Sequence, residues 1–358
     1  MEAQDVRYHL PSIFQKVGAY LGEPFGYSPK MNVNELGFDG KTQVGLKLGR
    51  IRSIDVSVQA TGDVEVGCFS GDVDIDSEKG NVYSIIGNNV RINRGKKVDV
   101  GVPRGNVYIG KCDSADVQNP SGNVEIFVCN GDARIGGTRG KEATIRSAGG
   151  NAFIGWVYDG SAKILSSGGD AEIRHAKVAR IENCNGDLAK IGQTEEGAFI
   201  SGALGNAEVF YAKGLVDIRA VKGRVYVNEC DGSVFIQNSG SALVEESEEV
   251  YFSKVHDAEY YKTGILKTNE FTHIENLTLG NTGKIVFDGG YIENLVLPAG
   301  VKIGDIEIKG QPAIGKFTYD GESLGDIETI NRELDPSLPL MFRVAVLNGM
   351  KKYNELFR

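Results

Sequence analysis

Residues 62–75 read GDVEVGCFSGDVDI, and the phrase in them, Gly–Asx–Val/Ala–any residue–Ile/Val, recurs along the chain to about residue 245. Further copies are GNVYI at 105–109, GNVEI at 122–126, GDAEI at 169–173 and GNAEV at 205–209. Within each copy apolar and polar residues alternate, which is the period of a strand with one buried face. A turn rich in Gly, Asn, Asp and Ser follows each strand. A short strand and a turn repeated at a fixed spacing predict a solenoid.

The spacing of this phrase indicates the size of one coil. Its Val or Ala position recurs about every 9 residues between residues 64 and 243. We number the copies from the one at Val64. Every even copy carries Ile two positions after its Val or Ala, whereas odd copies vary at that position and include Asn119 and Lys190. The Asx residue persists in odd copies and fades in even copies after Asn123. Because two positions alternate with the same parity, we predict an all-β fold, a parallel β-solenoid whose repeating coil holds two strands and about 18 residues.

The pattern divides the chain into four parts. Residues 42–245 are expected to form the regular solenoid and residues 246–330 a continued, less regular one. Residues 1–41 are predicted to form an N-terminal cap with a short helix at 10–22, and residues 331–358 a C-terminal helix. Open solenoid ends expose unpaired strand edges, so terminal helices are best explained as caps. Docking on another chain, or on a membrane surface, is the alternative for these helices.

Composition limits the kinds of partner. The chain has 358 residues, 41% of them hydrophobic, and a net charge of −9. This acidic balance argues against a nucleic-acid surface, which needs a basic face to displace counterions from phosphates. No apolar run is long enough for a membrane-spanning helix. The start, MEAQDVRYHLPSIFQK, has no basic segment followed by an apolar one. We therefore expect a cytoplasmic protein, with non-classical export or a place in a virion as alternatives.

No residue pattern predicts a metal or a cofactor. The Asx residues are expected to form turns, because the paired glycines of calcium-binding nonapeptide repeats are mostly missing. The cysteines are odd in number and widely spaced, which favours reduced, buried turn-fillers; they are Cys68, Cys112, Cys129, Cys184 and Cys230. None of the four histidines lies in a metal-binding motif, and there is no phosphate-binding loop.

An enzyme is not expected from this repeat. No Ser/His/Asp arrangement accompanies a nucleophile motif, and outward carboxylates such as Asp74 and Glu125 would need a cleft to act on sugars. The repeat is almost free of insertions between positions 64 and 243, so it lacks the long loops that usually form such a cleft. A carbohydrate-active or carbohydrate-binding β-helix is the alternative that remains.

Aromatic residues at outward positions are the candidate interaction sites. They interrupt faces that are otherwise polar, and as a lateral stripe they would suit contact with a protein or a glycan. The residues at outward strand positions are Tyr83, Tyr108, Phe153, Phe199, Tyr226 and Phe235, and those in the expected C-terminal helix are Phe342 and Tyr353.

The GDVEV and SGDVDI phrases resemble the GDV-repeat, adhesin-like β-solenoids of bacteria and archaea, over roughly residues 62–245. A weaker likeness is to the bactofilins, which are short cytosolic β-helices that polymerise end to end. These resemblances imply a parallel β-solenoid. We accordingly expect a structural or interaction protein, a rigid β-solenoid that acts as a scaffold, self-assembles into homo-oligomers or binds protein partners.

Overall fold

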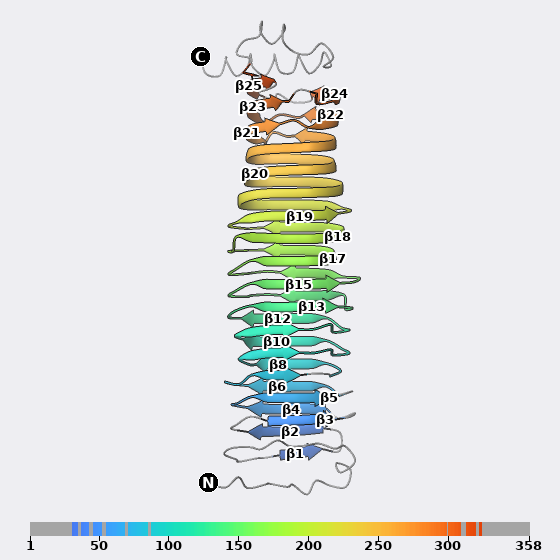
Figure 1. Ribbon diagram of the computed structural model, residues 1–358, viewed down its shortest axis with the longest axis vertical. Helices are drawn as coiled ribbons and strands as arrows, with labels where there is room; N and C mark the ends of the chain where they lie inside the picture. Colours follow the sequence, from blue (N-terminus) through green and yellow to red (C-terminus); the bar gives the residue numbers. More distant parts are fainter. Residues whose placement is uncertain are drawn as a thin grey trace. The chain divides into compact units, whose positions relative to one another are not determined.

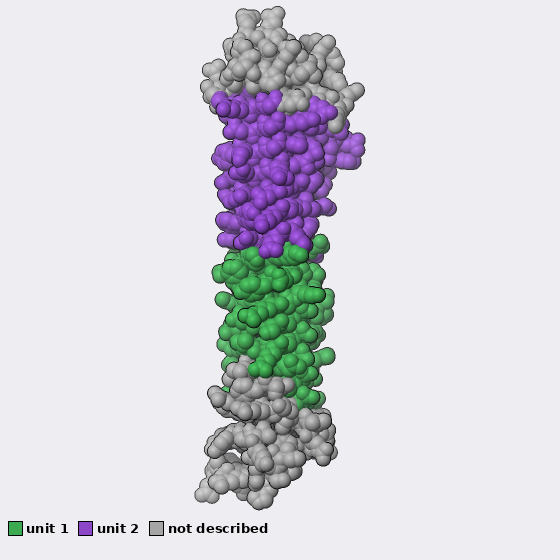
Figure 2. Space-filling view, turned by 90° about the vertical axis from the view of Figure 1, so that its right-hand side faces the viewer, with its two compact units in different colours: residues 1–181 green, residues 182–358 purple. Residues whose placement is uncertain are grey.

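The computed structural model describes residues 31–34, 37–42, 46–51, 55–68, 71–84, 87–298, 300–308, 313–319 and 322–323, and these contain strands and turns but no helix. Two compact units divide the chain, residues 1–181 and 182–358 (Figure 2). The helices expected at 10–22 and within 331–358 lie outside the described residues. The predicted all-β fold is confirmed in both units.

Unit 1 is a parallel β-solenoid in which most strands pair with the strand two positions away in sequence (Figure 1). Its strands are β1 (Met31–Asn34), β2 (Gly37–Thr42), β3 (Leu46–Ile51), β4 (Asp55–Ala60), β5 (Val64–Cys68), β6 (Val73–Ser77), β7 (Val82–Ser84), β8 (Val90–Arg94), β9 (Lys97–Val100), β10 (Val107–Cys112), β11 (Ser114–Val117), β12 (Val124–Cys129), β13 (Ala133–Thr138), β14 (Glu142–Ile145), β15 (Ala152–Val157), β16 (Ser161–Ile164) and β17 (Ala171–Glu182). We call β4, β6 and on to β16 the even-strand sheet, and β3, β5 and on to β15 the odd-strand sheet. β17 continues both, because its first half pairs with β15 and its second half with β16. β1 and β2, which fall within the expected N-terminal cap, form an antiparallel pair.

The register of these pairs sets the length of the coil. Val90 pairs with Val73 on one side and with Val107 on the other. Hydrogen bonds between equivalent turn residues of successive coils span 17 residues in this part of unit 1, and 19 residues just before β13 and β15. The even-copy isoleucines, from Ile75 to Ile236, are all buried. Two strands in a coil of about 18 residues are therefore confirmed.

The structure corrects the predicted register at two odd copies. Ala115, and not Val117, pairs with Val98 and Ala133. Likewise Ala189, and not Leu188, pairs with Ala207. Consequently Val117 and Ile191 are buried, Asn119 is exposed and Lys190 points outward. At these two copies the apparent variability reflects a misaligned register, whereas Ser84, which pairs in register with Val66 and Val100, is a true departure from the pattern. The coil length therefore rests on strand pairing rather than on that position.

Most strands of unit 2 also pair in parallel, and its coils lengthen toward β25. Its strands are β18 (Leu188–Ser201), β19 (Asn206–Ala212), β20 (Leu215–Thr268), β21 (His273–Thr278), β22 (Asn281–Phe287), β23 (Tyr291–Leu297), β24 (Ile303–Ile308), β25 (Ala313–Tyr319) and β26 (Glu322–Ser323). Ile292 pairs with Ile314, a longer step than the one between β6 and β8 of unit 1. Larger side chains fill these coils, since Phe252, Tyr260 and Phe287 are among the most deeply buried residues. Solenoid structure thus extends through the region where the sequence phrase degrades.

The Asx residues link successive coils. In unit 1, Oδ1 of Asp72 accepts the backbone N–H of Asn89 at 3.0 Å. Asn89 accepts that of Asn106 at 2.9 Å, and Asn106 accepts that of Asn123 at 2.8 Å. Asp132 and Asn151 do the same on the odd-strand side. The side chains bond backbone, as the turn hypothesis predicts, but their partner is the equivalent residue one coil later. These ladders add a hydrogen bond between coils beyond those of the strands.

Candidate functional site

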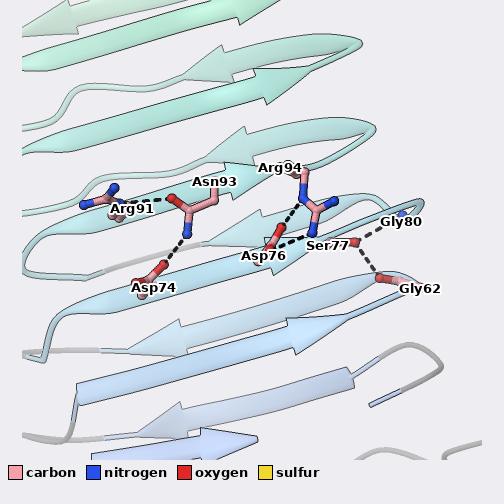
Figure 3. A network of polar contacts seen from close by, with 8 residues as sticks. All are labelled: Gly62, Asp74, Asp76, Ser77, Gly80, Arg91, Asn93 and Arg94. Carbon is pink, nitrogen blue, oxygen red and sulfur yellow. Dashed lines mark hydrogen bonds and ion pairs between the residues drawn. The ribbon is translucent and has the colours of Figure 1, made fainter. Parts of the chain in front are cut away.

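Outward side chains of the even-strand sheet form columns, because the register repeats from coil to coil. Figure 3 shows outward residues of β6 and β8, from two neighbouring columns. Asn93 donates to Asp74 at 2.9 Å and accepts from Arg91 at 3.0 Å. Arg94 makes two parallel hydrogen bonds with Asp76, at 2.7 and 2.8 Å. In this part of the sheet Asn93 and Arg94 are therefore engaged with carboxylates of the preceding coil rather than directed to a common point.

The two carboxylates considered for sugar chemistry do not form a pair. Asp74 and Glu125 lie three coil steps apart in one column. At ~4.8 Å per step this is about 14 Å, beyond the ~5–9.5 Å that separates the two carboxyl groups of glycosidases. Glu125 also forms an ion pair with Arg146. This pair therefore lacks the geometry for acid–base work on a glycosidic bond.

The predicted aromatic residues do not share one stripe. In unit 1, Tyr83 and Phe153 lie on the odd-strand sheet, whereas Tyr108 lies on the even-strand sheet. In unit 2, Phe199 of β18 pairs in register with Asp217 at the start of β20. Tyr226 lies further along β20 and pairs with Glu208 of β19, which belongs to the other sheet. Phe342 and Tyr353 lie outside the described residues. The outward aromatics are thus divided between two faces.

Unit 2 contains an aromatic and charged cluster that the sequence pattern did not reveal in full. Phe235 stacks on Tyr251 with ring centroids 4.3 Å apart and planes 7° from parallel. Nζ of Lys267 lies 5.1 Å from the Tyr251 ring centroid, donates to its hydroxyl at 2.8 Å and pairs with Glu249. The hydrogen bond to Glu249 raises the pKa of Lys267. Tyr251 and Lys267 lie where the repeat phrase has degraded, so no periodic signal marked them.

A second aromatic cluster lies on the odd-strand sheet of unit 1. The Phe153 ring has the guanidinium of Arg134 4.9 Å from its centroid and that of Arg174 4.8 Å away. Three residues along β15, Trp156 faces His175 with ring centroids 5.5 Å apart. Trp156 lies four positions after the Ala of its repeat, at a position the alternating pattern does not cover. Its only sequence signal is that it is the single tryptophan of the chain.

Four cysteines are confirmed as buried turn-fillers. Cys112, Cys129, Cys184 and Cys230 are buried, and their thiols lie against backbone carbonyl groups. Cys112 and Cys129 pair in register on adjacent coils. A hydrogen bond between these two thiols, together with burial, raises the pKa of Cys112. Burial raises the pKa of Cys230 to about 11. The side chain of Cys68 lies outside the described residues.

Two titratable side chains of unit 2 have carboxylate partners that shift their pKa values. Tyr226 donates to Glu245 at 2.6 Å, and this hydrogen bond raises the pKa of the phenol to about 12. His256 contacts Asp257 and Glu275, and the hydrogen bond to Asp257 raises the pKa of the imidazole. Across the described ranges no group of three or more His, Cys, Asp or Glu residues is arranged to hold a metal ion. Nor does that part of the chain contain a helix able to cross a membrane.

Comparison of the chain with protein-family models, curated proteins and solved structures gives no match.

Proposed function

We propose that the chain is a non-enzymatic structural or interaction protein, in which the solenoid of each unit is a scaffold. Such a scaffold presents columns of side chains to protein partners or to further copies of the chain. The likeness to adhesin-like and bactofilin-type solenoids is part of this proposal, as is a cytoplasmic location.

The coil-to-coil ladders are the observation that carries the proposal. Successive coils are held together by strand pairing, and several also by Asx side chains such as Asn89 and Asn106. Charged outward groups form pairs across coils, as Arg94 and Asp76 do. A catalytic site needs groups aimed at a reacting atom and free to change partners. The coils are held together by hydrogen bonds, and charged side chains on their surface already form ion pairs. Such a stack is better suited to displaying a binding surface than to catalysis.

The proposal is tested by combining sedimentation with an assay of turnover. We expect sedimentation velocity to show association that grows with protein concentration. We also expect incubation with acidic and neutral polysaccharides to release no more reducing ends than the heat-denatured protein does. Reducing ends released by the wild type and lost in Glu125→Gln would contradict the non-enzymatic assignment. A strictly monomeric species at every concentration would contradict self-assembly and leave only the partner-binding scaffold.

A further inference from the structure

Two cysteines of unit 1 lie next to each other on adjacent coils. Cys112 ends β10 and Cys129 ends β12, and the two residues pair in register. The neighbour of Cys129 on the following coil is Ala148, and in unit 2 the neighbour of Cys230 on the preceding coil is Ala212. Among the cysteines whose side chains the structure describes, this pair is therefore the one in which two thiols face each other.

The backbone holds the pair at a separation that a disulfide can bridge. In-register residues of adjacent parallel strands lie ~4.8 Å apart, and the Cα atoms of a disulfide lie ~4.4–6.8 Å apart. Sγ of Cys112 is directed toward the following coil, since it lies 3.8 Å from the carbonyl oxygen of Val128. The thiols of Cys112 and Cys129 are hydrogen-bonded to each other. Closing a bond between the sulfurs therefore requires adjustment of two side chains, and no change of strand register.

The surroundings tolerate the loss of the thiol hydrogens. Cys112 and Cys129 are only 2% and 1% exposed, and a disulfide carries no polar hydrogen that burial would leave unpaired. The thiol of Cys129 donates to the carbonyl oxygen of Asp132 at 3.1 Å. That oxygen also accepts the backbone N–H of Ala115 at 3.0 Å, so it stays paired when the thiol hydrogen is lost. The hydrogen bond from Cys112 lowers the pKa of Cys129, which makes Cys129 the more nucleophilic partner.

We propose that Cys112 and Cys129 are a redox-sensitive modification site, at which a disulfide closes between adjacent coils in an oxidising medium. The oxidant is a low-molecular-weight disulfide such as oxidised glutathione. The thiolate of Cys129 attacks one of its sulfurs and releases one glutathione thiolate. The thiolate of Cys112 then attacks the Cys129 sulfur of this mixed disulfide and releases the second. Two cysteine thiols are thereby oxidised, one glutathione disulfide is reduced, and the two protons pass to the two glutathione thiolates.

The cross-link would close one coil into a covalent ring, because Cys112 and Cys129 are one coil step apart. A disulfide stabilises the native state by restricting the unfolded chain. The cytoplasm keeps thiols reduced, whereas an exported chain meets an oxidising medium. This site goes beyond the proposed scaffold role, because it makes the stability of the stack depend on the compartment. The pair stays an open dithiol in the cytoplasm and closes outside it.

Peptide mapping of the full-length protein tests the bond directly. A Cys68→Ser background leaves four cysteines. The protein is equilibrated with oxidised and reduced glutathione in urea below the unfolding midpoint, where local opening of the turns admits the reagent. A second sample is refolded from denaturant in the same buffer, so that the oxidant meets the open chain. After alkylation in denaturant, mass spectrometry of unreduced peptides should show Cys112 linked to Cys129, with Cys184 and Cys230 linked to no other cysteine.

Thermal unfolding with and without dithiothreitol measures the effect of the bond. We expect the oxidised form to melt roughly 6–12 °C above the reduced form, the shift for a loop of this length in a unit of this size. Cys129→Ser should remove both the linked peptide and the shift. Cys230→Ser is the matched control, because it alters a buried cysteine whose neighbour is Ala212, and it should keep both.

Three outcomes would overturn the proposal. One is recovery of Cys112 and Cys129 as free thiols or separate glutathione adducts, without the linked peptide, by both routes of oxidation. Another is a link between Cys184 and Cys230 as abundant as the one between Cys112 and Cys129, which would show pairing without regard to register. An oxidised form that melts no higher than the reduced form would refute the stabilising role of the cross-link.

Discussion

Gly155→Ala and Gly136→Ala form a matched pair that tests how closely the coils stack. Both glycines lie on the odd-strand sheet, in β15 and β13, and β13 and β15 pair in parallel. A methyl group on Gly155 would lie 1.8 Å from Gly136 O, whereas one on Gly136 would lie 3.6 Å from its nearest neighbour. The first contact is about 1.5 Å too short for van der Waals separation, so the two backbones must move apart.

The expected cost of Gly155→Ala follows from that displacement. Overpacking costs ~1–3 kcal/mol, and weakening two backbone hydrogen bonds between β13 and β15 adds ~0.5–1.5 kcal/mol for each bond. We expect a loss of about 2–6 kcal/mol in the free energy of unfolding, or roughly 4–24 °C in melting temperature for a unit of this size. Gly136→Ala should be neutral or stabilising by up to ~1 kcal/mol, because alanine loses less backbone entropy on folding.

Denaturant unfolding followed by far-ultraviolet circular dichroism measures both free energies. If Gly155→Ala proved as stable as Gly136→Ala, the close approach of the two coils would be wrong, and with it the register of β13 and β15.

Three further predictions concern the core, the thiols and one phenol. Ile126→Asp buries a carboxylate among apolar side chains and should cost several kcal/mol, whereas its outward neighbour Glu125→Ala should cost at most ~1 kcal/mol; a soluble, equally heat-stable Ile126→Asp protein would refute the inward assignment. Iodoacetamide followed by mass spectrometry should leave Cys112, Cys129, Cys184 and Cys230 unmodified in the native protein and modify them in denaturant, and rapid native labelling would show that these turns are open. The pKa of Tyr226 is raised from ~10 to about 12, so its contribution to stability is fully present below pH ~10 and lost as the pH rises through 12. The loss of stability between those pH values should be smaller in Glu245→Gln, and an identical loss would contradict the role of that hydrogen bond.

The periodic part of the structure could be predicted from the sequence because one repeat unit has few ways to bury its apolar face. Ile75 and its equivalents recur at the same inward position, and that regularity indicates both the strand and the coil. Small inward residues are harder to place. Ala115 and Ala189 resemble outward alanines in sequence, so the pattern favours Val117 and Leu188 as the repeat position in their place. Only backbone pairing decides between nearby apolar residues.

The candidate surfaces were predicted less well, for a physical reason. The alternating pattern covers three positions of each strand, but the next two residues also reach the surface before the chain turns inward at Cys112 or its equivalents. Trp156 occupies one of these later positions. Its neighbours on the surface, Gly137 and His175, come from the preceding and the following coil. No local pattern connects residues that only the stacking of coils brings together.

The in-register columns of unit 1 underlie the scaffold proposal, and pulsed electron paramagnetic resonance tests this stacking most directly. In a Cys68→Ser background, spin labels would be placed by Asp74→Cys with Lys163→Cys, and by Asp74→Cys with Arg180→Cys. Positions 74, 163 and 180 share one column, in which the last two lie five and six coil steps from the first. At ~4.8 Å per step the Cα separations should be about 24 and 29 Å. Two narrow distributions whose means differ by about one coil step are expected. Means that do not increase from position 163 to position 180 would contradict the stacked, two-strand coil.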